Sequence, residues 1–397
     1  MNCGSQPKDF QFGAEQLLSE YIHLIKNKKI GIVTNHTAVL KNGVHLVDTL
    51  NSFKDIKITA LFGPEHGIRG NYSDGESIDN SVDSKTGIHV YSLYGKYKKP
   101  TKEMLKDIEV LIFDIQDIGA RFYTYISTMF YSIQAAAENN IPIIILDRPN
   151  PINGVYVDGP IRKPDLISFV GIAPLPITHG MTIGELANYF VGEKLISDSL
   201  KVDLKIIKMK NWERNLFFNS FCEQWIHPSP NIPSLETAIV YPGICLIEGT
   251  NISEGRGTDA PFLTIGAPFI NSTKLIEELI SQELDGLLLE PISFTPKEIK
   301  GRAVNPKFKD KYCNGIKITI TDNLKFESVK FGIKLISTLY RLYPNDFKFK
   351  DDSFDRLAGD KLIRQKIIEG ISSEKIIQSY QSELNVFKEI RKKYLLY

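Results

Sequence analysis

Short apolar runs alternate with amphipathic helical segments through the first half of the chain, and this alternation constrains the fold more than any other feature. The runs lie at 29–34, 56–62, 110–115 and 141–146. They are apolar nearly throughout, as strands buried on both faces are. Helical stretches follow at 44–53, 129–139 and 183–193, and a further alternating strand lies at 202–209. Repeated strand–helix–strand units imply a parallel sheet with right-handed crossovers.

The chain has 397 residues, enough for two domains. Segment 211–257 is rich in Pro and Gly and holds both tryptophans, so we interpret it as the crossing between domains. Beyond it we predict a strand at 312–321 and a helix stopped by Pro344, followed by one last helix at about 374–394 with an apolar stripe. The predicted architecture is α/β: a Rossmann-like parallel-sheet domain at 12–225, followed by a smaller mixed α/β domain at 226–397.

Charge and cysteine content exclude several classes of protein. The net charge is +1, so the chain lacks the excess of Lys and Arg that a nucleic-acid-binding protein uses to neutralise phosphates. No apolar run approaches the roughly 18–20 residues that span a bilayer. The four cysteines form no CxxC pair, which leaves a zinc or redox motif without support.

The first residues, MNCGSQP, bear on location. Cys-Gly-Ser followed by polar residues is typical of the start of a mature bacterial lipoprotein, so Cys3 is a candidate lipid anchor. This interpretation predicts a protein of the cell envelope or periplasm whose signal segment is not in this chain. The alternative is an incidental cysteine in a cytoplasmic protein.

Polar side chains gather where the predicted strands end. Ligands bind outside the carboxyl ends of the strands in an open parallel sheet, so these residues are the first candidates for a site. They are Asn35 after the first strand, Glu65, His66 and Arg69 after the second, Asp114, Asp117, Arg121, Tyr123 and Tyr125 after the third, and Asp147 and Arg148 after the fourth. His179 lies just before a helix whose start is marked by a capping box, Thr182 and Glu185.

Motifs for nucleotides and for nucleophilic catalysis are missing. The turn after the first strand reads TNHTAV, without the glycines that let phosphate approach backbone N–H groups. Neither a G-x-S-x-G elbow nor an H-E-x-x-H helix occurs. We therefore predict no cofactor. A metal held by Asp114, Asp117 and His66, as in a metal-dependent hydrolase, is the alternative.

Carboxylates among hydrogen-bonding groups and aromatic rings are typical of sugar-binding sites. Glycoside hydrolysis characteristically uses two carboxyl groups. A second cluster supplies further candidates within CLIEGTNISEGRGTDAPF, namely Glu248, Asn251, Glu254 and Arg256. Aromatic candidates elsewhere include Trp225 and Tyr241.

These motifs together resemble one bacterial family, the exo-β-N-acetylmuramidases of the NamZ type. The resemblance runs over nearly the whole chain and is carried by TNHTAV, LFGPEHGIRG, FDIQDIGARFYTYISTM, LDRPNPING, THGMTIGELA, PSPNIP, YPGICLIEGTNISEGRGTDAPF and FDRLAGD. It implies an active site in the cleft between the two domains. It also implies hydrolysis of the β-1,4 bond that joins a non-reducing-end N-acetylmuramic acid to N-acetylglucosamine in peptidoglycan fragments.

The resemblance places the family's catalytic glutamate on Glu65, with His66 to orient or tune it. The second group stays open: Asp117, Glu248, Glu254 or the N-acetyl group of the substrate. Arg69, Arg121 and Arg256 are candidates for pairing with the lactyl carboxylate of muramic acid, because a guanidinium fork suits a carboxylate. Further substrate-binding candidates are Asn35, Tyr123, His179 and Asn251. The alternative function is a noncatalytic muropeptide-binding protein of the envelope.

Overall fold

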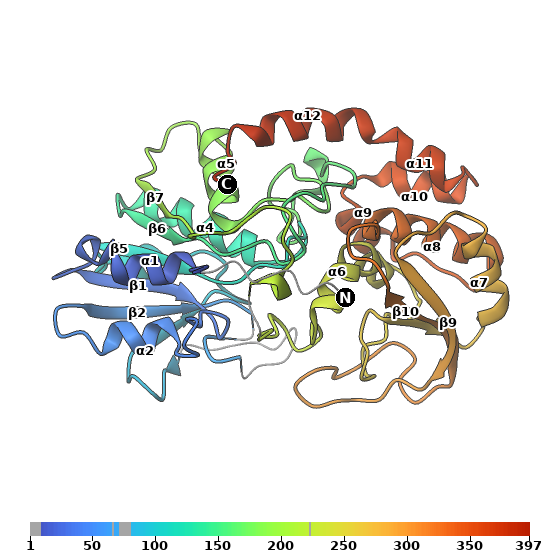
Figure 1. Cartoon of the computed structure of the whole chain (residues 1–397), viewed down its shortest axis with the longest axis horizontal. Helices are drawn as coiled ribbons and strands as arrows, with labels where there is room; N and C mark the ends of the chain where they lie inside the picture. Colours follow the sequence, from blue (N-terminus) through green and yellow to red (C-terminus); the bar gives the residue numbers. More distant parts are fainter. Residues whose placement is uncertain (1–8, 66, 71–80, 222–223) are drawn as a thin grey trace.

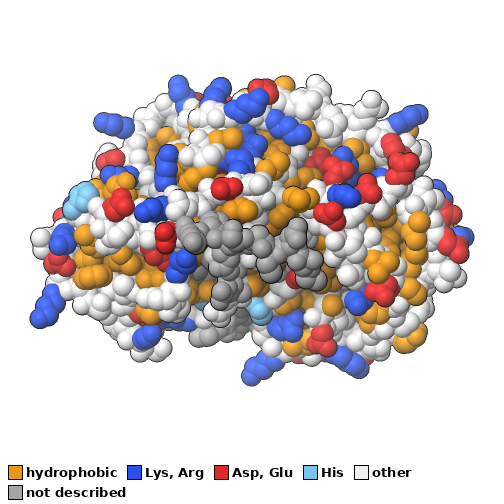
Figure 2. All heavy atoms as spheres, viewed as in Figure 1, with side chains coloured by type: hydrophobic (Ala, Val, Ile, Leu, Met, Phe, Trp, Pro, Cys, Tyr) orange, Lys and Arg blue, Asp and Glu red, His pale blue; other side chains and the backbone are white. Residues whose placement is uncertain are grey.

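The structure is a computed structural model that describes residues 9–65, 67–70, 81–221 and 224–397. Cys3 and His66 lie outside the described residues, so the predictions made for them stay predictions. No helix within the described ranges is long and apolar enough to cross a membrane. Acidic and basic side chains occur over both halves of the face in Figure 2, in keeping with the small net charge.

The first half of the chain forms a seven-stranded sheet among the described residues, in the order β3-β4-β2-β1-β5-β6-β7. All neighbouring strands are parallel except β3 and β4. The strands are β1 (Lys29–Thr34), β2 (Lys57–Gly63), β3 (Ser81–Val82), β4 (His89–Ser92), β5 (Val110–Asp114), β6 (Ile143–Leu146) and β7 (Leu204–Ile207). The predicted Rossmann-like sheet is confirmed, since the apolar runs form its central strands.

Helices connect these strands: α1 (Gly13–Ser19), α2 (Leu46–Asn51), α3 (Lys102–Leu105), α4 (Tyr125–Glu138) and α5 (Ile183–Gly192). The capping box at the start of α5 is present. Thr182 Oγ1 accepts a hydrogen bond from Glu185 N, and Glu185 Oε2 accepts one from Thr182 N. The sequence analysis did not predict α1, α3, β3 or β4, which are all short.

The second half forms a smaller antiparallel sheet in the order β8-β10-β9, drawn on the right of Figure 1. Its strands are β8 (Thr264–Ala267), β9 (Leu287–Phe294) and β10 (Cys313–Ile320). The helices are α6 (Leu235–Ile244), α7 (Ser272–Ile280), α8 (Ser328–Leu342), α9 (Asp351–Ala358), α10 (Lys361–Ile368), α11 (Ser373–Ser379) and α12 (Gln381–Lys392).

The sequence analysis did not anticipate two features of the helices. Segment 211–257 is more than a crossing, because it contains α6, which packs against α8, and the 3₁₀ turn Cys245–Gly249. Apart from Glu236, α6 is buried on all sides, so no helical stripe marks it in the sequence. The single last helix is in fact two, α11 and α12, which meet at the buried Tyr380.

The C-terminal residues return to the first half of the chain. In Figure 1, α12 runs along the top of the molecule from α11 to the neighbourhood of α5, where the chain ends. Arg391 Nη2 donates to Gly180 O (2.7 Å), and Tyr397 Oη donates to Asp147 Oδ2 (2.8 Å), directly after β6. The end of the predicted second domain is therefore packed on the first sheet.

Candidate functional site

A pocket of about 200 Å³ lies where the first half of the chain meets the second. Its lining, hereafter the Glu65 pocket, includes Glu65 from the end of β2 and the run from Phe122 to Tyr125 after β5. The second half contributes Tyr241, Cys245, Glu248, Arg256, Phe262 and Leu357, with Ser229 and Ile232 from the segment between.

A tight turn delivers Glu65 to this pocket. Gly67 N donates a hydrogen bond to Pro64 O (3.0 Å), which closes a turn directly after β2. Gly67 has a φ of +68°, a left-handed conformation that glycine adopts without strain. Gly63 and Pro64 before Glu65, and Gly67 two residues after it, therefore act together to turn the chain sharply. The half-buried side chain of Glu65 lies at this bend.

Aromatic rings form one wall of the Glu65 pocket. Tyr123 meets Tyr125 edge to face with ring centroids 4.9 Å apart, and Tyr241 meets Phe262 in the same way at 4.9 Å. Tyr125 Oη donates to Pro228 O (2.6 Å). Rings fixed by such packing offer flat apolar faces beside polar groups, as a sugar requires.

Arg256 and Glu248 form an ion pair within the lining of the Glu65 pocket. Glu248 Oε1 accepts from Arg256 Nε (3.2 Å) and from Nη2 (2.8 Å). The guanidinium lies 5.4 Å from the centroid of Phe262. Glu65 and Glu248 are the two carboxylates among the described lining residues, and Arg256 is their one arginine.

The other two candidate carboxylates do not line the Glu65 pocket. Glu254 is only 4% exposed and pairs with Lys307 Nζ at 2.9 Å. Asp117 is buried, and Oδ2 accepts from Gly119 N (2.7 Å). Burial raises the pKa of Asp117 to about 7. Its neighbour His179 has Nε2 at 3.8 Å, and burial lowers the pKa of that imidazole to about 3, so both groups favour their neutral forms.

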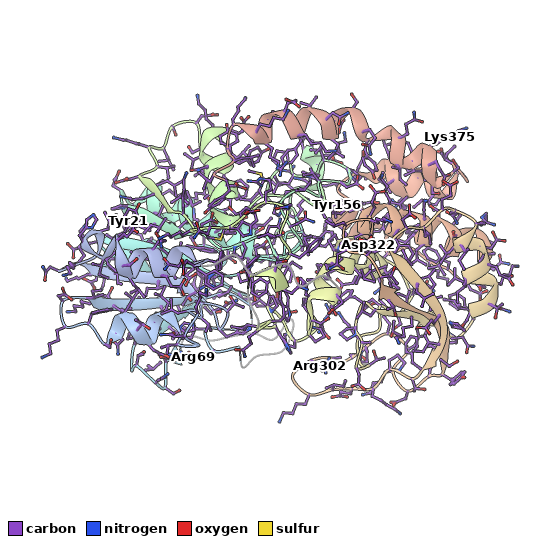
Figure 3. The ribbon with its side chains drawn as sticks, in the orientation of Figure 1. Tyr21, Arg69, Tyr156, Arg302, Asp322 and Lys375 are labelled. Carbon is purple, nitrogen blue, oxygen red and sulfur yellow. The ribbon has the colours of Figure 1, made fainter. Side chains whose placement is uncertain are left out.

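The remaining candidates do not line the pocket and bind backbone groups or carboxylates instead. Arg69, labelled in Figure 3, pairs with Asp48 (2.9 Å) and Asp83 (2.7 Å), and its hydrogen bond lowers the pKa of Asp83 to about 2. Arg121 donates to the carbonyls of Pro160, Leu175 and Leu357. Asn251 bonds the backbone of Asp346 and Lys348, and Asn35 bonds Thr37.

Sequence reasoning missed Ser229, Cys245 and Phe262 as lining residues. Each lies within a stretch that carries the family resemblance, which is the signal that marks the region but not the residue. Within the described ranges, no group of three or more His, Cys, Asp or Glu side chains is placed to hold a metal ion. Asp114, one of the proposed ligands, pairs instead with Arg148 through Oδ2 at 3.0 Å.

Comparisons with known proteins agree with this architecture. Residues 30–236 match the family model described as exo-β-N-acetylmuramidase NamZ, N-terminal, and residues 239–397 match its C-terminal counterpart. The peptidoglycan β-N-acetylmuramidase NamZ of Bacillus subtilis is 50% identical over 388 residues, which are 98% of this chain and 91% of that protein.

Two crystal structures of DUF1343 family proteins from Bacteroides fragilis share the fold. One superposes with a TM-score of 0.89 at 34% identity, the other with 0.78 at 36%, and both matches cover 98% of this chain and 99% of the other. Family models over most of the chain, a half-identical relative of nearly the same extent and two solved structures agree. The chain belongs to the NamZ family of exo-β-N-acetylmuramidases.

Proposed function

We propose that this protein is a glycoside hydrolase that cleaves the β-1,4 bond between a non-reducing-end N-acetylmuramic acid and the following N-acetylglucosamine of peptidoglycan fragments. Family membership supports the reaction. The observation that carries the proposal is that Glu65, Glu248 and Arg256 meet in one pocket with an aromatic wall. At about 200 Å³ the pocket is smaller than a site for a drug-sized ligand, which suits a single terminal sugar and exo-cleavage.

In this proposal Glu65 is the general acid. It stands at a fixed turn, half-buried at the mouth between the two halves of the chain, and gives its proton to the departing glycosidic oxygen. Glu248 is the second carboxylate, because it is the other one among the described lining residues. Its bond to Arg256 holds the Glu248 side chain in the pocket, where its carboxylate stabilises the positive charge that develops on the sugar ring.

Arg256 is proposed to recognise the lactyl carboxylate of muramic acid. The three candidate arginines differ in what they hold. Arg69 is engaged by two aspartates and Arg121 by three carbonyls, and neither arginine lines the pocket. Arg256 also pairs with carboxylates, Glu248 at 2.8 Å and Glu254 at 3.6 Å, but unlike the other two it lines the pocket and is a quarter exposed, where a guanidinium suits a ligand carboxylate.

An envelope location follows from a peptidoglycan substrate, and we propose Cys3 as the lipid anchor on the basis of the Cys-Gly-Ser sequence. Expression behind a bacterial lipoprotein signal segment, followed by membrane fractionation, tests this. The wild-type protein is expected in the membrane fraction, and Cys3→Ala is expected to leave it. Equal distribution of the two proteins would contradict the anchor.

A chromogenic β-N-acetylmuramide tests the activity. We expect wild-type protein to release the chromophore with or without chelator, and Glu65→Gln to lose at least about 10²-fold in kcat, as expected for removal of a general acid. Circular dichroism checks that the variant is folded, and Glu103→Gln, an exposed glutamate on α3, is the matched control. No release by the wild type would favour a binding protein, and loss with chelator would favour a metal enzyme.

A further inference from the structure

One loop, residues 224–233, borders three hollows in succession. Gln224, Trp225 and Ile226 line a hollow of about 520 Å³, hereafter the Trp225 pocket. Ile226, His227, Pro230 and Pro233 line a second, of about 470 Å³, together with His36 and Arg302, hereafter the His36 pocket. Ser229 and Ile232 line the Glu65 pocket. Ile226 is shared by the first two hollows, and Ser229 and Pro230 are adjacent, so the three follow one another along this loop and are hereafter called the row of hollows.

Both halves of the chain hold this loop in place. His36 Nε2 hydrogen-bonds His227 O (2.7 Å), and Tyr125 Oη bonds Pro228 O (2.6 Å) from the first half. Asn231 Nδ2 bonds the carbonyl of Arg302, which lies on the connection between β9 and β10 and is labelled in Figure 3. Trp225 and Ser229 are four residues apart, so at most about 14 Å of chain separates the outer hollows.

The Trp225 pocket lies at the switch point of the larger sheet. Thr37 and Gln116, which follow the neighbouring strands β1 and β5, both line it. The chain leaves these two strands in opposite directions, and the crevice so formed is where open α/β sheets bind ligands. The rings of Phe12, Phe218, Phe221 and Trp225 supply apolar faces. Trp225 Nε1 donates to Ile232 O (3.0 Å), which fixes the indole.

Gln116, which lines this pocket, has one buried amide atom without a partner. The side chain is 4% exposed, and its Nε2 donates to the carbonyls of Asp117 and Pro149, both at 2.7 Å. Those two bonds fix which end of the amide is nitrogen. Oε1 has no hydrogen-bond partner among the described residues. A buried acceptor of this kind calls for an O–H or N–H group.

The charges around the Trp225 pocket favour an anion. Arg148 is already neutralised by Asp114, whereas Lys41 is exposed at the mouth and donates to Phe10 O (2.9 Å). The described lining residues include no carboxylate. The pocket thus combines aromatic faces and a cation, which together suit a sugar ring that bears a carboxylate.

We infer that the row of hollows binds the glycan beyond the bond that is cut. The terminal N-acetylmuramic acid occupies the Glu65 pocket, the next N-acetylglucosamine lies in the His36 pocket, and the second N-acetylmuramic acid lies in the Trp225 pocket with its carboxylate toward Lys41. Alternation of the two sugars along peptidoglycan puts the acidic sugar in both outer hollows. The identification of the ligand as a peptidoglycan strand rests on the proposed function. The row of hollows itself rests on the lining of the three pockets.

Substrates of different glycan length test this inference separately from the hydrolytic activity. For wild-type protein we expect kcat/KM to be higher for a peptide-free tetrasaccharide than for the disaccharide. Trp225→Ala should lower the tetrasaccharide-to-disaccharide ratio by roughly tenfold, the loss of one central aromatic contact. Trp225→Phe, which keeps a ring, should retain most of the ratio, and Lys41→Gln should lower it. Phe53→Ala and Lys54→Gln, exposed residues outside the hollows, are matched controls.

Equal kcat/KM for the two substrates, or an unchanged ratio in both Trp225→Ala and Lys41→Gln, would overturn the inference while the activity stood. If Trp225→Ala does not fold, Lys41→Gln and Trp225→Phe decide the question. Failure of the wild type to hydrolyse either substrate would instead remove the proposed function.

Binding without cleavage supplies a second readout. In Glu65→Gln, we expect the tetrasaccharide to change tryptophan emission much more than the disaccharide does, because Trp225 is half-buried and Trp212 is buried elsewhere. Adding Trp225→Phe should remove the change. A change that persists without Trp225, or no change with the tetrasaccharide, would contradict occupation of the Trp225 pocket.

Discussion

The role proposed for Arg256, recognition of the lactyl carboxylate, follows from its position in the pocket and its contacts rather than from its being an arginine. We expect Arg256→Gln to raise the inhibition constant of N-acetylmuramic acid by about tenfold or more, because a charged contact to the lactyl carboxylate is lost. The inhibition constant of N-acetylglucosamine, which lacks that group, should change little. Competition assays with the chromogenic substrate measure both constants.

Arg69→Gln is the matched control for this prediction. Arg69 binds Asp48 and Asp83 away from the Glu65 pocket, so its loss should lower the melting temperature and leave the ratio of the two inhibition constants as it was. An equal loss of affinity for both sugars in Arg256→Gln would show that the arginine supports the pocket without reading the lactyl group.

Asp117 leads to a prediction about pH. Its carboxyl has a pKa of about 7 when buried and about 4 when unfolded, so the folded state holds a proton that the unfolded state has lost between those values. This group therefore makes the protein less stable as pH rises from about 4 to about 7. Asp117→Asn keeps an acceptor for Gly119 N and does not ionise.

The stability of Asp117→Asn relative to wild type should thus increase over pH 4–7 and level off above. Urea unfolding at a series of pH values measures it. His179 acts in the opposite sense: below pH 6.5 its imidazole takes up a proton in the unfolded chain but not in the folded one, so stability falls as pH falls. Both proteins contain His179, so its contribution cancels in the difference between their unfolding free energies. Parallel stability curves would contradict a buried, neutral carboxyl at 117.

The sequence predicted the types of residue at the site better than their partners. Glu65, Tyr123, Glu248 and Arg256 were chosen at strand ends and in one motif, and they line a common pocket. Arg69 was chosen by the same reasoning, yet Asp48 and Asp83 hold it elsewhere. Such ion pairs join residues distant in sequence, and no spacing rule indicates them.

At the scale of the element, the hydrophobic pattern of the sequence predicted the strands and helices that carry such a pattern. The strand predicted at 29–34 has those bounds, because a fully buried strand is apolar throughout. Helix α5 begins at its capping box. Helix α6 was missed because burial on nearly every side removes the stripe, and the break between α11 and α12 was missed because the apolar spacing continues across it.

Helix α9 ends at a glycine that is needed for two separate reasons. Gly359 has a φ of +82°, and a Cβ placed there would lie 2.6 Å from Arg121 Nη1. Gly370, beyond α10, has a φ of +73° with open space around it. We expect Gly370→Ala to cost about 1 kcal/mol from backbone strain alone, and Gly359→Ala to cost about 1–3 kcal/mol more because the buried arginine is displaced from its carbonyls.

Denaturant unfolding of the two glycine variants measures this difference. Comparable losses would mean that Arg121 moves aside without cost, and that its bond to Leu357 O contributes little to holding α9 against the first half of the chain.

At the scale of the whole molecule, each half of the chain is held by residues of the other, so the two halves are not independent units. Arg121 from the first half binds Leu357 O of the second, and the tail after α12 returns to the first sheet. There Tyr394 Oη donates to Glu193 (2.6 Å), and Leu396 N donates to Glu185 (2.8 Å). The Glu65 pocket draws its walls from both halves, so its geometry depends on this interlocking.

The full chain should therefore unfold in one calorimetric transition. A chain that stops after Lys392 loses several partly buried hydrogen bonds, including the one from Tyr397 to Asp147, a carboxyl whose pKa burial raises to about 7. We expect its melting temperature to fall by roughly 5–10 °C and the transition to broaden or split, because the first half loses a support that the second supplies. Tyr397→Phe, which removes only the hydroxyl, should give a smaller fall with a single transition. If the truncated chain melted like the full one, the tail would contribute little to stability, and activity would survive its removal. If the tail holds the two halves together, the truncated chain should lose hydrolysis of the chromogenic substrate at the temperature where its own unfolding begins.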